Sequence, residues 1–176
     1  EEIESTVRRT IQINSDLFLS SQIVYTLGPF ENSGPIPPRA EQETTYTVLW
    51  DVANSSNDVK NARITTRLPS YVEWFGLINP SNENVVYNPT SREVIWNIGD
   101  VPVGTGYTTS PRQLAFKIGF TPSLSQVGDD DDLVGEQIIE GLDTFTNEII
   151  RASKRALTTE ITNDPGVSQG SGRISE

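Results

Sequence analysis

The stretch that decides the fold runs from residue 45 to residue 69 and reads TYTVLWDVANSSNDVKNARITTRLP. Its first half places large apolar residues on every second position, at Tyr46, Val48, Trp50 and Val52. Successive side chains of a strand point to opposite faces, so this set predicts a strand with one face on a core. The run at 54–58 is dense in residues that bond their own backbone and predicts a turn. A second alternating set predicts another half-buried strand that stops at Pro69: Ala62, Ile64, Thr66 and Leu68.

Similar segments recur along the chain. Residues 85–98 predict a hairpin with its turn at 88–91, and residues 112–122 predict a strand with Leu114, Phe116, Ile118 and Phe120 on one face. Residues 28–43 hold four prolines and predict an extended connection along a sheet edge. Residues 129–142 begin like a helix, but their two glycines favour strand and loop.

Eight or nine short strands separated by turns indicate an all-β fold. The pattern favours an antiparallel Greek-key β-sandwich, with a barrel as the alternative. We expect a strand or linker at 1–15, the sandwich at 16–163, and a linker or flexible tail at 164–176. The large aromatic residues expected to anchor the core between the sheets are Trp50, Trp74, Trp96 and Phe116. For the three tryptophans, a platform that stacks on a ligand is the alternative.

Composition excludes several kinds of chemistry. The chain has no cysteine and no histidine, which removes disulfides, thiolate nucleophiles, the commonest general base and the usual zinc sites. Its net charge of −11 disfavours nucleic acids and anionic membrane surfaces as partners. No stretch is long and apolar enough to predict insertion into a membrane. The absence of methionine favours a piece excised or processed from a longer protein.

Four consecutive aspartates form the most distinctive cluster of charge, Asp129, Asp130, Asp131 and Asp132. Alternate members, joined by Asp143 or Glu136, could offer oxygen ligands to Ca²⁺ at about 2.3–2.6 Å. The alternative is a solvated acidic loop that keeps the surface soluble. The prediction is therefore either no cofactor or a calcium ion at Asp129–Asp132 and Asp143.

An enzyme is disfavoured by the same composition. Cleavage of a sugar needs two acids about 5–10 Å apart in a cleft, and four acids qualify by type without any spacing that pairs them: Asp51, Glu73, Asp100 and Asp143. No catalytic residue is predicted. If aromatic residues near loops were exposed, they could stack on sugar rings, so a calcium-assisted carbohydrate-binding module is the alternative function, with Phe30, Phe75 and Tyr107 as its candidates.

Several motifs together resemble a known type of domain. They are the quoted stretch extended to 44–74, VVYNPTSREVIWNIGDVPVGTG at 85–106, LAFKIGFTPSLSQVG at 114–128 and DTFT at 143–146. Jointly they are similar to the repeat domains of unknown function in very large bacterial cell-surface proteins, over about residues 33–165. The four aspartates depart from that type, which usually has small polar residues and a proline there.

The resemblance implies an immunoglobulin-like sandwich without catalysis. It implies an exported, extracellular module of the cell surface, strung in tandem as a stalk, coat, fibre or adhesin. Its partners would be neighbouring modules or copies of itself, with glycans as an alternative. The alternating run TVRRTIQIN at 6–14 predicts that the N-terminal segment adds to the sheet of a neighbour.

Overall fold

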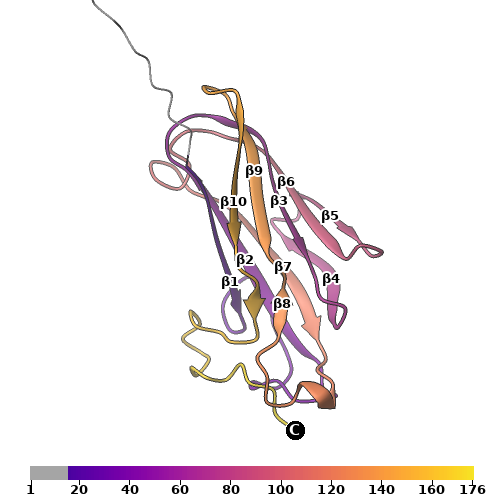
Figure 1. Ribbon diagram of the computed structural model, residues 1–176. Helices are drawn as coiled ribbons and strands as arrows, with labels where there is room; N and C mark the ends of the chain where they lie inside the picture. Colours follow the sequence, from indigo (N-terminus) through magenta and orange to yellow (C-terminus); the bar gives the residue numbers. More distant parts are fainter. Residues whose placement is uncertain (1–15) are drawn as a thin grey trace, which may run out of the picture.

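Two antiparallel sheets pack face to face along the length of the molecule (Figure 1). The computed structural model describes residues 16–176, so the expected N-terminal strand at 1–15 and its strand addition lie outside the described residues. The first sheet has the order β1-β2-β7-β4, with β1 Leu17–Val24, β2 Thr44–Asn54, β7 Arg112–Phe120 and β4 Val72–Asn79.

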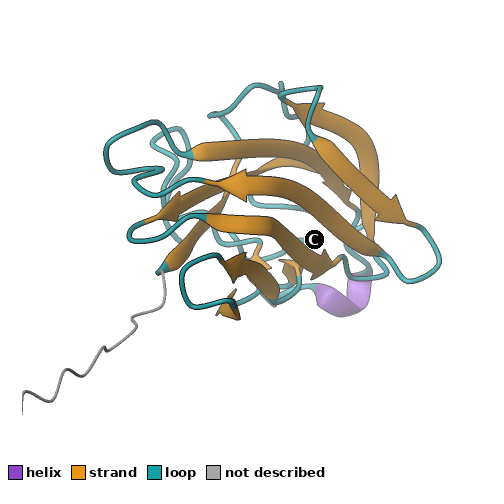
Figure 2. Cartoon of the chain, turned by 90° about the horizontal axis from the view of Figure 1, so that it is seen from above, coloured by secondary structure: helices purple, strands orange, loops and turns teal. Residues whose placement is uncertain are grey.

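The second sheet has five strands in the order β10-β9-β3-β6-β5. Their bounds are β10 Glu148–Lys154, β9 Gln137–Asp143, β3 Val59–Arg67, β6 Glu93–Val101 and β5 Asn84–Asn88. A small pair, β8 Asp132–Val134 and β11 Leu157–Thr158, and one 3-10 turn, η1 Leu124–Gln126 (purple in Figure 2), complete the described chain. The chain crosses repeatedly between sheets, which confirms the all-β, immunoglobulin-like Greek-key sandwich. No helix in the described part has the length and apolar character to span a bilayer.

The stretch at 45–69 folds as its pattern predicts. It forms most of β2, a turn, and β3, and the turn carries the chain from one sheet to the other. Both predicted inward sets are buried, including Trp50 and Ile64 at 0% exposure. The predicted hairpin at 85–98 is confirmed by β5 and β6, where Val85 pairs with Trp96 and Tyr87 with Val94. Residues 129–142 form loop and the strands β8 and β9, as expected.

The proline-rich segment 28–43 meets the edge of β2 just beyond the end of β1, as predicted, since the Thr45 N–H donates to the Ser33 carbonyl at 2.8 Å; it also covers a face of the sheet, which the prediction did not include. It lies across the outer face of β2, where the Asn32 amide donates to the Thr47 hydroxyl at 3.0 Å and the Ser33 backbone N–H donates to the Thr45 hydroxyl at 2.8 Å. Prolines remove the backbone donors that an edge strand needs, whereas outward threonine hydroxyls offer partners to the segment's polar groups. The segment thereby buries Thr45 and Thr47 on the face opposite the core.

Residues 164–176 also differ from the expected flexible tail. They form no strand, but Asp164 and Ile174 are buried, and Ile174 belongs to the hydrophobic core cluster. The Ser175 backbone donates to the Pro38 carbonyl at 2.9 Å and accepts from the Ala40 N–H at 2.9 Å. The polar, glycine-rich composition predicts a flexible tail because it gives no sign of two long-range contacts. One is the Ile174 side chain in the core, and the other is the Asp164 carboxylate bound to the turn after β1.

Aromatic rings fill the centre of the sandwich. Trp50 on β2 lies edge-on to Phe116 on β7, with ring centroids 4.9 Å apart, and is stacked at 6.3 Å on Trp96 of the opposite sheet. Trp74 on the edge strand β4 lies 5.2 Å from Phe116 and is only partly buried. Trp50, Trp96 and Phe116 are fully buried and join the two sheets through direct ring contacts.

Truncation of Phe116 should therefore cost far more stability than truncation of an exposed phenylalanine. We expect Phe116→Ala to lower the free energy of unfolding by about 3–5 kcal/mol, because Trp50 and Trp74 both lose a ring contact and a cavity remains. Phe145→Ala, at a residue 56% exposed, should change it by less than about 0.5 kcal/mol. Urea unfolding followed by tryptophan fluorescence measures both, and equal losses would contradict this account of the core.

Candidate functional site

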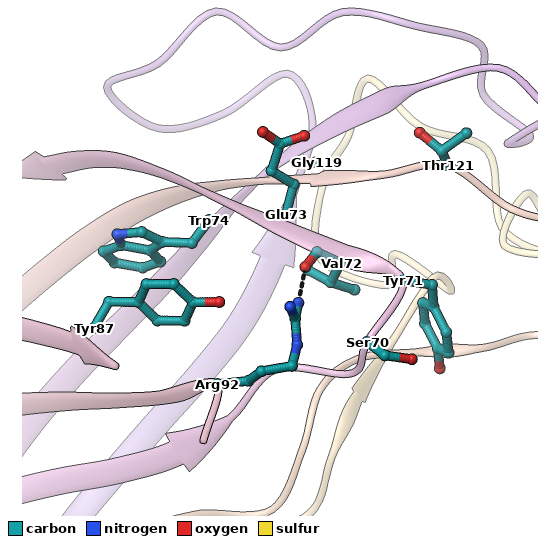
Figure 3. Close-up of a pocket in the computed structure, with 9 residues that line it drawn as sticks. All are labelled: Ser70, Tyr71, Val72, Glu73, Trp74, Tyr87, Arg92, Gly119 and Thr121. Carbon is teal, nitrogen blue, oxygen red and sulfur yellow. Dashed lines mark hydrogen bonds between the residues drawn. The ribbon is translucent and has the colours of Figure 1, made fainter. Parts of the chain in front are cut away.

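A surface hollow of about 490 Å³ lies beside the edge strand β4 (Figure 3). Its walls include Tyr71, Glu73 and Trp74 from the start of β4, Tyr87 from β5 and Arg92 from the β5–β6 turn. β4 and β5 are edge strands of different sheets, so the hollow lies between the two sheets at one open side of the sandwich. Its aromatic and charged lining makes it a candidate ligand site.

The aromatic pair in the hollow is already engaged. Trp74 and Tyr87 stack at 5.4 Å with an interplanar angle of 24°, and Phe116 lies against the indole from the core. Figure 3 shows the two rings side by side, with Tyr87 covering one face of the indole. A sugar ring would have to displace Tyr87 to stack there. The pair therefore closes the open side of the sandwich instead of presenting a free platform.

Arg92 also has a structural role. Its guanidinium donates to the carbonyls of Leu68 at 3.2 Å, Pro69 at 2.7 Å and Val72, and so holds the connection between β3 and β4. Figure 3 shows the guanidinium against Val72, while the Glu73 carboxylate points another way. Glu73 is the single carboxylate that lines the hollow. Acid–base cleavage of a sugar needs two, so this hollow offers no such pair.

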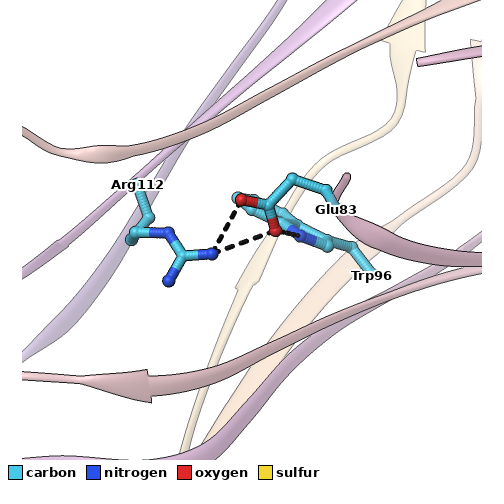
Figure 4. A network of polar contacts seen from close by, with 3 residues as sticks. All are labelled: Glu83, Trp96 and Arg112. Atoms are coloured by element: carbon cyan, nitrogen blue, oxygen red, sulfur yellow. Dashed lines mark hydrogen bonds and ion pairs between the residues drawn. The ribbon is translucent and has the colours of Figure 1, made fainter. Parts of the chain in front are cut away.

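A partly buried polar network joins Glu83, Trp96 and Arg112 (Figure 4). The Glu83 carboxylate accepts a hydrogen bond from the Trp96 indole N–H at 2.8 Å and an ion-paired contact from Arg112 at 2.8 Å. Arg112 begins β7 in one sheet, and Trp96 lies on β6 in the other. Glu83, in the connection between β4 and β5, therefore links both sheets through one carboxylate. Its side chain is 13% exposed, so this charge-assisted contact is partly shielded from water.

The other central indole has a matching partner. The Trp50 N–H donates to the Gln137 side-chain oxygen at 2.7 Å, and the Gln137 amide donates to the Arg155 carbonyl at 2.9 Å. Gln137 is fully buried at the start of β9. Both indoles that lie in the middle of the core thus have satisfied N–H groups, which removes the desolvation cost of burying them.

The predicted calcium ligands do not come together. Asp143 is buried at the far end of β9, a strand of seven residues that spans about 20 Å, whereas Asp129–Asp132 precede that strand. Asp129, Asp130 and Asp132 are exposed, and the half-buried Asp131 accepts a hydrogen bond from the Gln126 amide at 2.7 Å. Residues 16–176 contain no cluster of three or more acidic, histidine or cysteine side chains placed to hold a metal ion. The five-aspartate set was therefore a wrong grouping.

Asp143 instead organises the β9–β10 turn. Its carboxylate accepts the Phe145 N–H at 2.8 Å, the Thr146 N–H at 3.0 Å and the Asn57 amide at 2.9 Å. The last contact joins the β9–β10 turn to the β2–β3 turn, which lies at the same end of the sandwich. Asn54 acts in a similar way, since its buried amide donates to the carbonyls of Asn57 and Val101.

Asp164 is the most unusual carboxylate of the described chain. It accepts backbone N–H groups from Tyr25 at 2.8 Å, Thr26 at 2.6 Å and Gly166 at 3.0 Å, together with the Thr26 hydroxyl. Burial alone would raise its pKa, but these hydrogen bonds favour the charged form and lower the pKa to about 2. The carboxylate fixes the C-terminal segment to the turn that follows β1.

The aromatic residues proposed to stack on sugars make no ring contact with one another. Tyr107 is 64% exposed in the loop between β6 and β7, and Phe75 is 37% exposed on β4, with the Lys117 ammonium 5.7 Å from its ring centre. Phe30 is half-buried in the proline-rich segment. Among the described residues, no ring contact joins any two of these three side chains. They do not form a shared stacking surface.

Sequence reasoning missed the polar residues that matter most in the structure. Glu83 stands in an Asn- and Ser-rich loop, Gln137 begins a strand, and Asp164 precedes a Pro-Gly turn. Each sequence context explains a local turn or strand. None indicates the partner, because Arg112, Trp50 and Tyr25 lie 29, 87 and 139 residues away in the chain.

Comparison with known proteins finds likeness in structure alone. No protein-family model and no curated protein matches the sequence. The major pilin subunit BcpA of Bacillus cereus is similar at a TM-score of 0.47 and 11% identity, over 81% of this chain and 40% of the pilin. A complex of RrgA Jo.In gives 0.46 and 11%, over 78% and 76%.

Two domains of the major pilin SpaD of Corynebacterium diphtheriae give a TM-score of 0.43 at 10% identity, over 80% of this chain and 51% of that one. This chain spans about two-fifths of the length of BcpA and about half of the SpaD fragment. All of these likenesses are distant.

Removal of the Glu83 charge should loosen both sheets. We expect Glu83→Gln to destabilise the fold by about 1–3 kcal/mol, because Arg112 and the Trp96 indole lose a shared charged acceptor. Glu73→Gln, at an exposed position in the hollow, is the matched control and should stay within about 0.5 kcal/mol of the parent. A double-mutant cycle with Arg112→Gln in urea isolates the pair, and a coupling energy near zero would contradict the proposed link.

Calcium should leave the stability of the domain unchanged. Since the predicted ligands lie at both ends of β9, we expect no heat on titration with Ca²⁺ and no shift of Tm at about 1 mM, the range of weak extracellular sites. A rise in Tm that disappears in the Asp130→Ala/Asp132→Ala variant would restore the acidic loop as a metal site.

The Asp164 carboxylate should make stability depend on pH in the acid range. Its pKa is about 2 in the folded state against an ordinary value of 3.8, so its contribution is complete above pH 3.8 and disappears as the pH falls to 2. The difference corresponds to about 2 kcal/mol. We expect the gap in unfolding free energy between the parent and Asp164→Asn to shrink by that amount from pH 5 to pH 2. A constant gap would show that the charge is unimportant.

Proposed function

We propose that this chain is a non-catalytic structural and adhesive module of an exported bacterial cell-surface protein, used as a building block of a stalk, coat or fibre. One observation carries the proposal: three carboxylates that are largely shielded from water join one segment of the fold to another. Glu83 links the sheets, Asp143 links two turns, and Asp164 links the C-terminal segment to the turn that follows β1. The sequence resemblance to repeat domains of surface proteins points the same way.

An apolar patch at one end of the sandwich supports contact with neighbouring modules or copies. We call it the end patch; it consists of Val103, Tyr107 and Phe145, which are 49%, 64% and 56% exposed. Asp58 draws its two loops together, since its carboxylate accepts the Val103 N–H at 2.9 Å and its carbonyl accepts the Thr144 N–H at 3.0 Å. Exposed apolar groups gathered at one end are typical of protein–protein contact surfaces.

Sedimentation velocity over a range of concentrations tests this proposal. We expect reversible self-association that Tyr107→Ser/Phe145→Ser weakens at least tenfold, because the end patch then loses most of its apolar surface. Leu124→Ser, at a residue 64% exposed in η1 at the opposite end of the sandwich, is the control for loss of an exposed apolar side chain and should leave association intact.

A glycan array tests the alternative function, a calcium-assisted carbohydrate-binding module. Strong retention of a glycan by a protein that stays monomeric at all concentrations would favour the carbohydrate-binding module and count against the structural role. Loss of that retention in a chelator would add the calcium dependence.

A further inference from the structure

The chain enters and leaves the sandwich at opposite ends. Leu17, the first residue of β1, pairs with Asn54 at one end of β2, while Ser175 forms a bridge to Arg39, just before the other end of β2. β2 has eleven residues and is about 35 Å long. Figure 1 shows the two ends of the described chain at opposite ends of the long axis. A pull on both ends would therefore act along the strands.

The end of β1 is tied directly to the C-terminal segment. Tyr25, Thr26 and Leu27 follow β1, and their three successive backbone N–H groups point at one oxygen of Asp164, at 2.8, 2.6 and 3.3 Å. The contact is tight, since a Cβ added at Gly166 would lie 2.4 Å from the Thr26 hydroxyl. A carboxylate that accepts several backbone N–H groups makes charge-assisted hydrogen bonds, which are about twice as strong as neutral ones.

A second tie lies further along the same segment. Residues 174 and 175 run between two other loops of the sandwich end. The Ile174 backbone donates to Asp129 at 3.1 Å and accepts from Gly128 at 2.9 Å, while Ser175 exchanges two bonds of 2.9 Å with Pro38 and Ala40. Between the two ties, the Glu160 carboxylate accepts the N–H groups of Gly170 at 2.8 Å and Gly172 at 2.9 Å. Three segments thus contact residues 159–175: the turn after β1, the stretch around Pro38 and Ala40, and the loop at Gly128 and Asp129.

We propose that residues 159–175 form a clasp that carries tension along the module by tying the exit of the chain to the end of β1. The inference rests on the proposed structural function. A pull at the C-terminal end reaches the Ser175 tie first and the Asp164 tie second. While Asp164 holds, the load passes straight into β1 and bypasses the small β8–β11 pair and the rest of the second sheet.

β1 is suited to bear that load. It pairs with β2 over eight consecutive residues without a register shift. Because the N-terminal handle pulls on the other end of the same strand, the tension runs along the covalent backbone of β1, and the hydrogen bonds to β2 keep that strand in its place in the sheet. Without the clasp, the same pull would enter through β11, whose pairing with β8 covers two residues. Such a short ladder would separate first.

Constant-force stretching of the whole chain between handles at its two ends tests the clasp. In the parent protein we expect an early extension of up to about 4 nm, the length of the eleven residues that follow Asp164 up to Ser175, before the sandwich unfolds in a much longer step. In Asp164→Ala we expect a shorter lifetime for the state reached after this early extension, in which the Ser175 tie is open and only the tie at residue 164 still holds; at a given force it should fall roughly tenfold or more. Asp130→Ala removes an exposed carboxylate at the same end and should keep the parent lifetime.

Hydrogen exchange gives a second readout that does not depend on force. In Asp164→Asn, which keeps the size of the side chain, the Tyr25 and Thr26 amides should exchange roughly tenfold to a hundredfold faster, because one acceptor oxygen becomes a donor. Amides in the middle of β2 should be unchanged, which shows that the sandwich stays folded.

The outcomes distinguish failure of the clasp proposal from failure of the proposed structural function. If the parent sandwich resists force and Asp164→Ala matches it in lifetime and exchange, the clasp is wrong and the structural function stands. If the parent unfolds in one step at forces too small to measure, both ideas fail. A shorter clasp lifetime together with faster exchange at Tyr25 and Thr26 supports the proposal.

Discussion

The contact between Trp50 and its aromatic neighbours is the constraint on which the rest of the structure depends. Trp50 lies at the centre of the four-stranded sheet, touches Phe116 in the same sheet and stacks on Trp96 across the core. Such large rings set the separation of the two sheets and leave each indole N–H in need of a partner. Gln137 and Glu83 meet that need. The apolar packing thereby dictates where the buried polar groups must lie.

The partners of these polar groups show what the carboxylates do in this fold. A catalytic or ligand-binding carboxylate must face a cleft and a substrate, but Glu83, Asp143 and Asp164 face backbone N–H groups, an indole and an arginine. Their hydrogen bonds join segments that are far apart in sequence. The consequence is a body whose loops and C-terminal segment are held in place.

The strands could be predicted because alternation is a local property. Tyr46 to Val52 and Leu114 to Phe120 show which residues face inward without any knowledge of their partners, and the hairpin at 85–98 contains its own turn. The candidate site could not be predicted in the same way. Asp143 was grouped with Asp129–Asp132 because they are near in sequence, yet a strand of seven residues carries Asp143 to the opposite end of the sandwich. The proline-rich segment showed that it could not pair as a strand, but not which face it would cover.

By itself, then, the sequence determined that this chain folds as an all-β sandwich with an aromatic core, since strand periodicity, turn residues and burial follow from neighbouring residues. It also determined that cysteine and histidine chemistry is absent, because composition alone decides that. Only the tertiary structure decided which polar residues act as ties. Asp164 meets Tyr25 across 139 residues, and Trp50 meets Gln137 across 87. Such pairings depend on how the strands cross between two sheets, and no local pattern encodes that route.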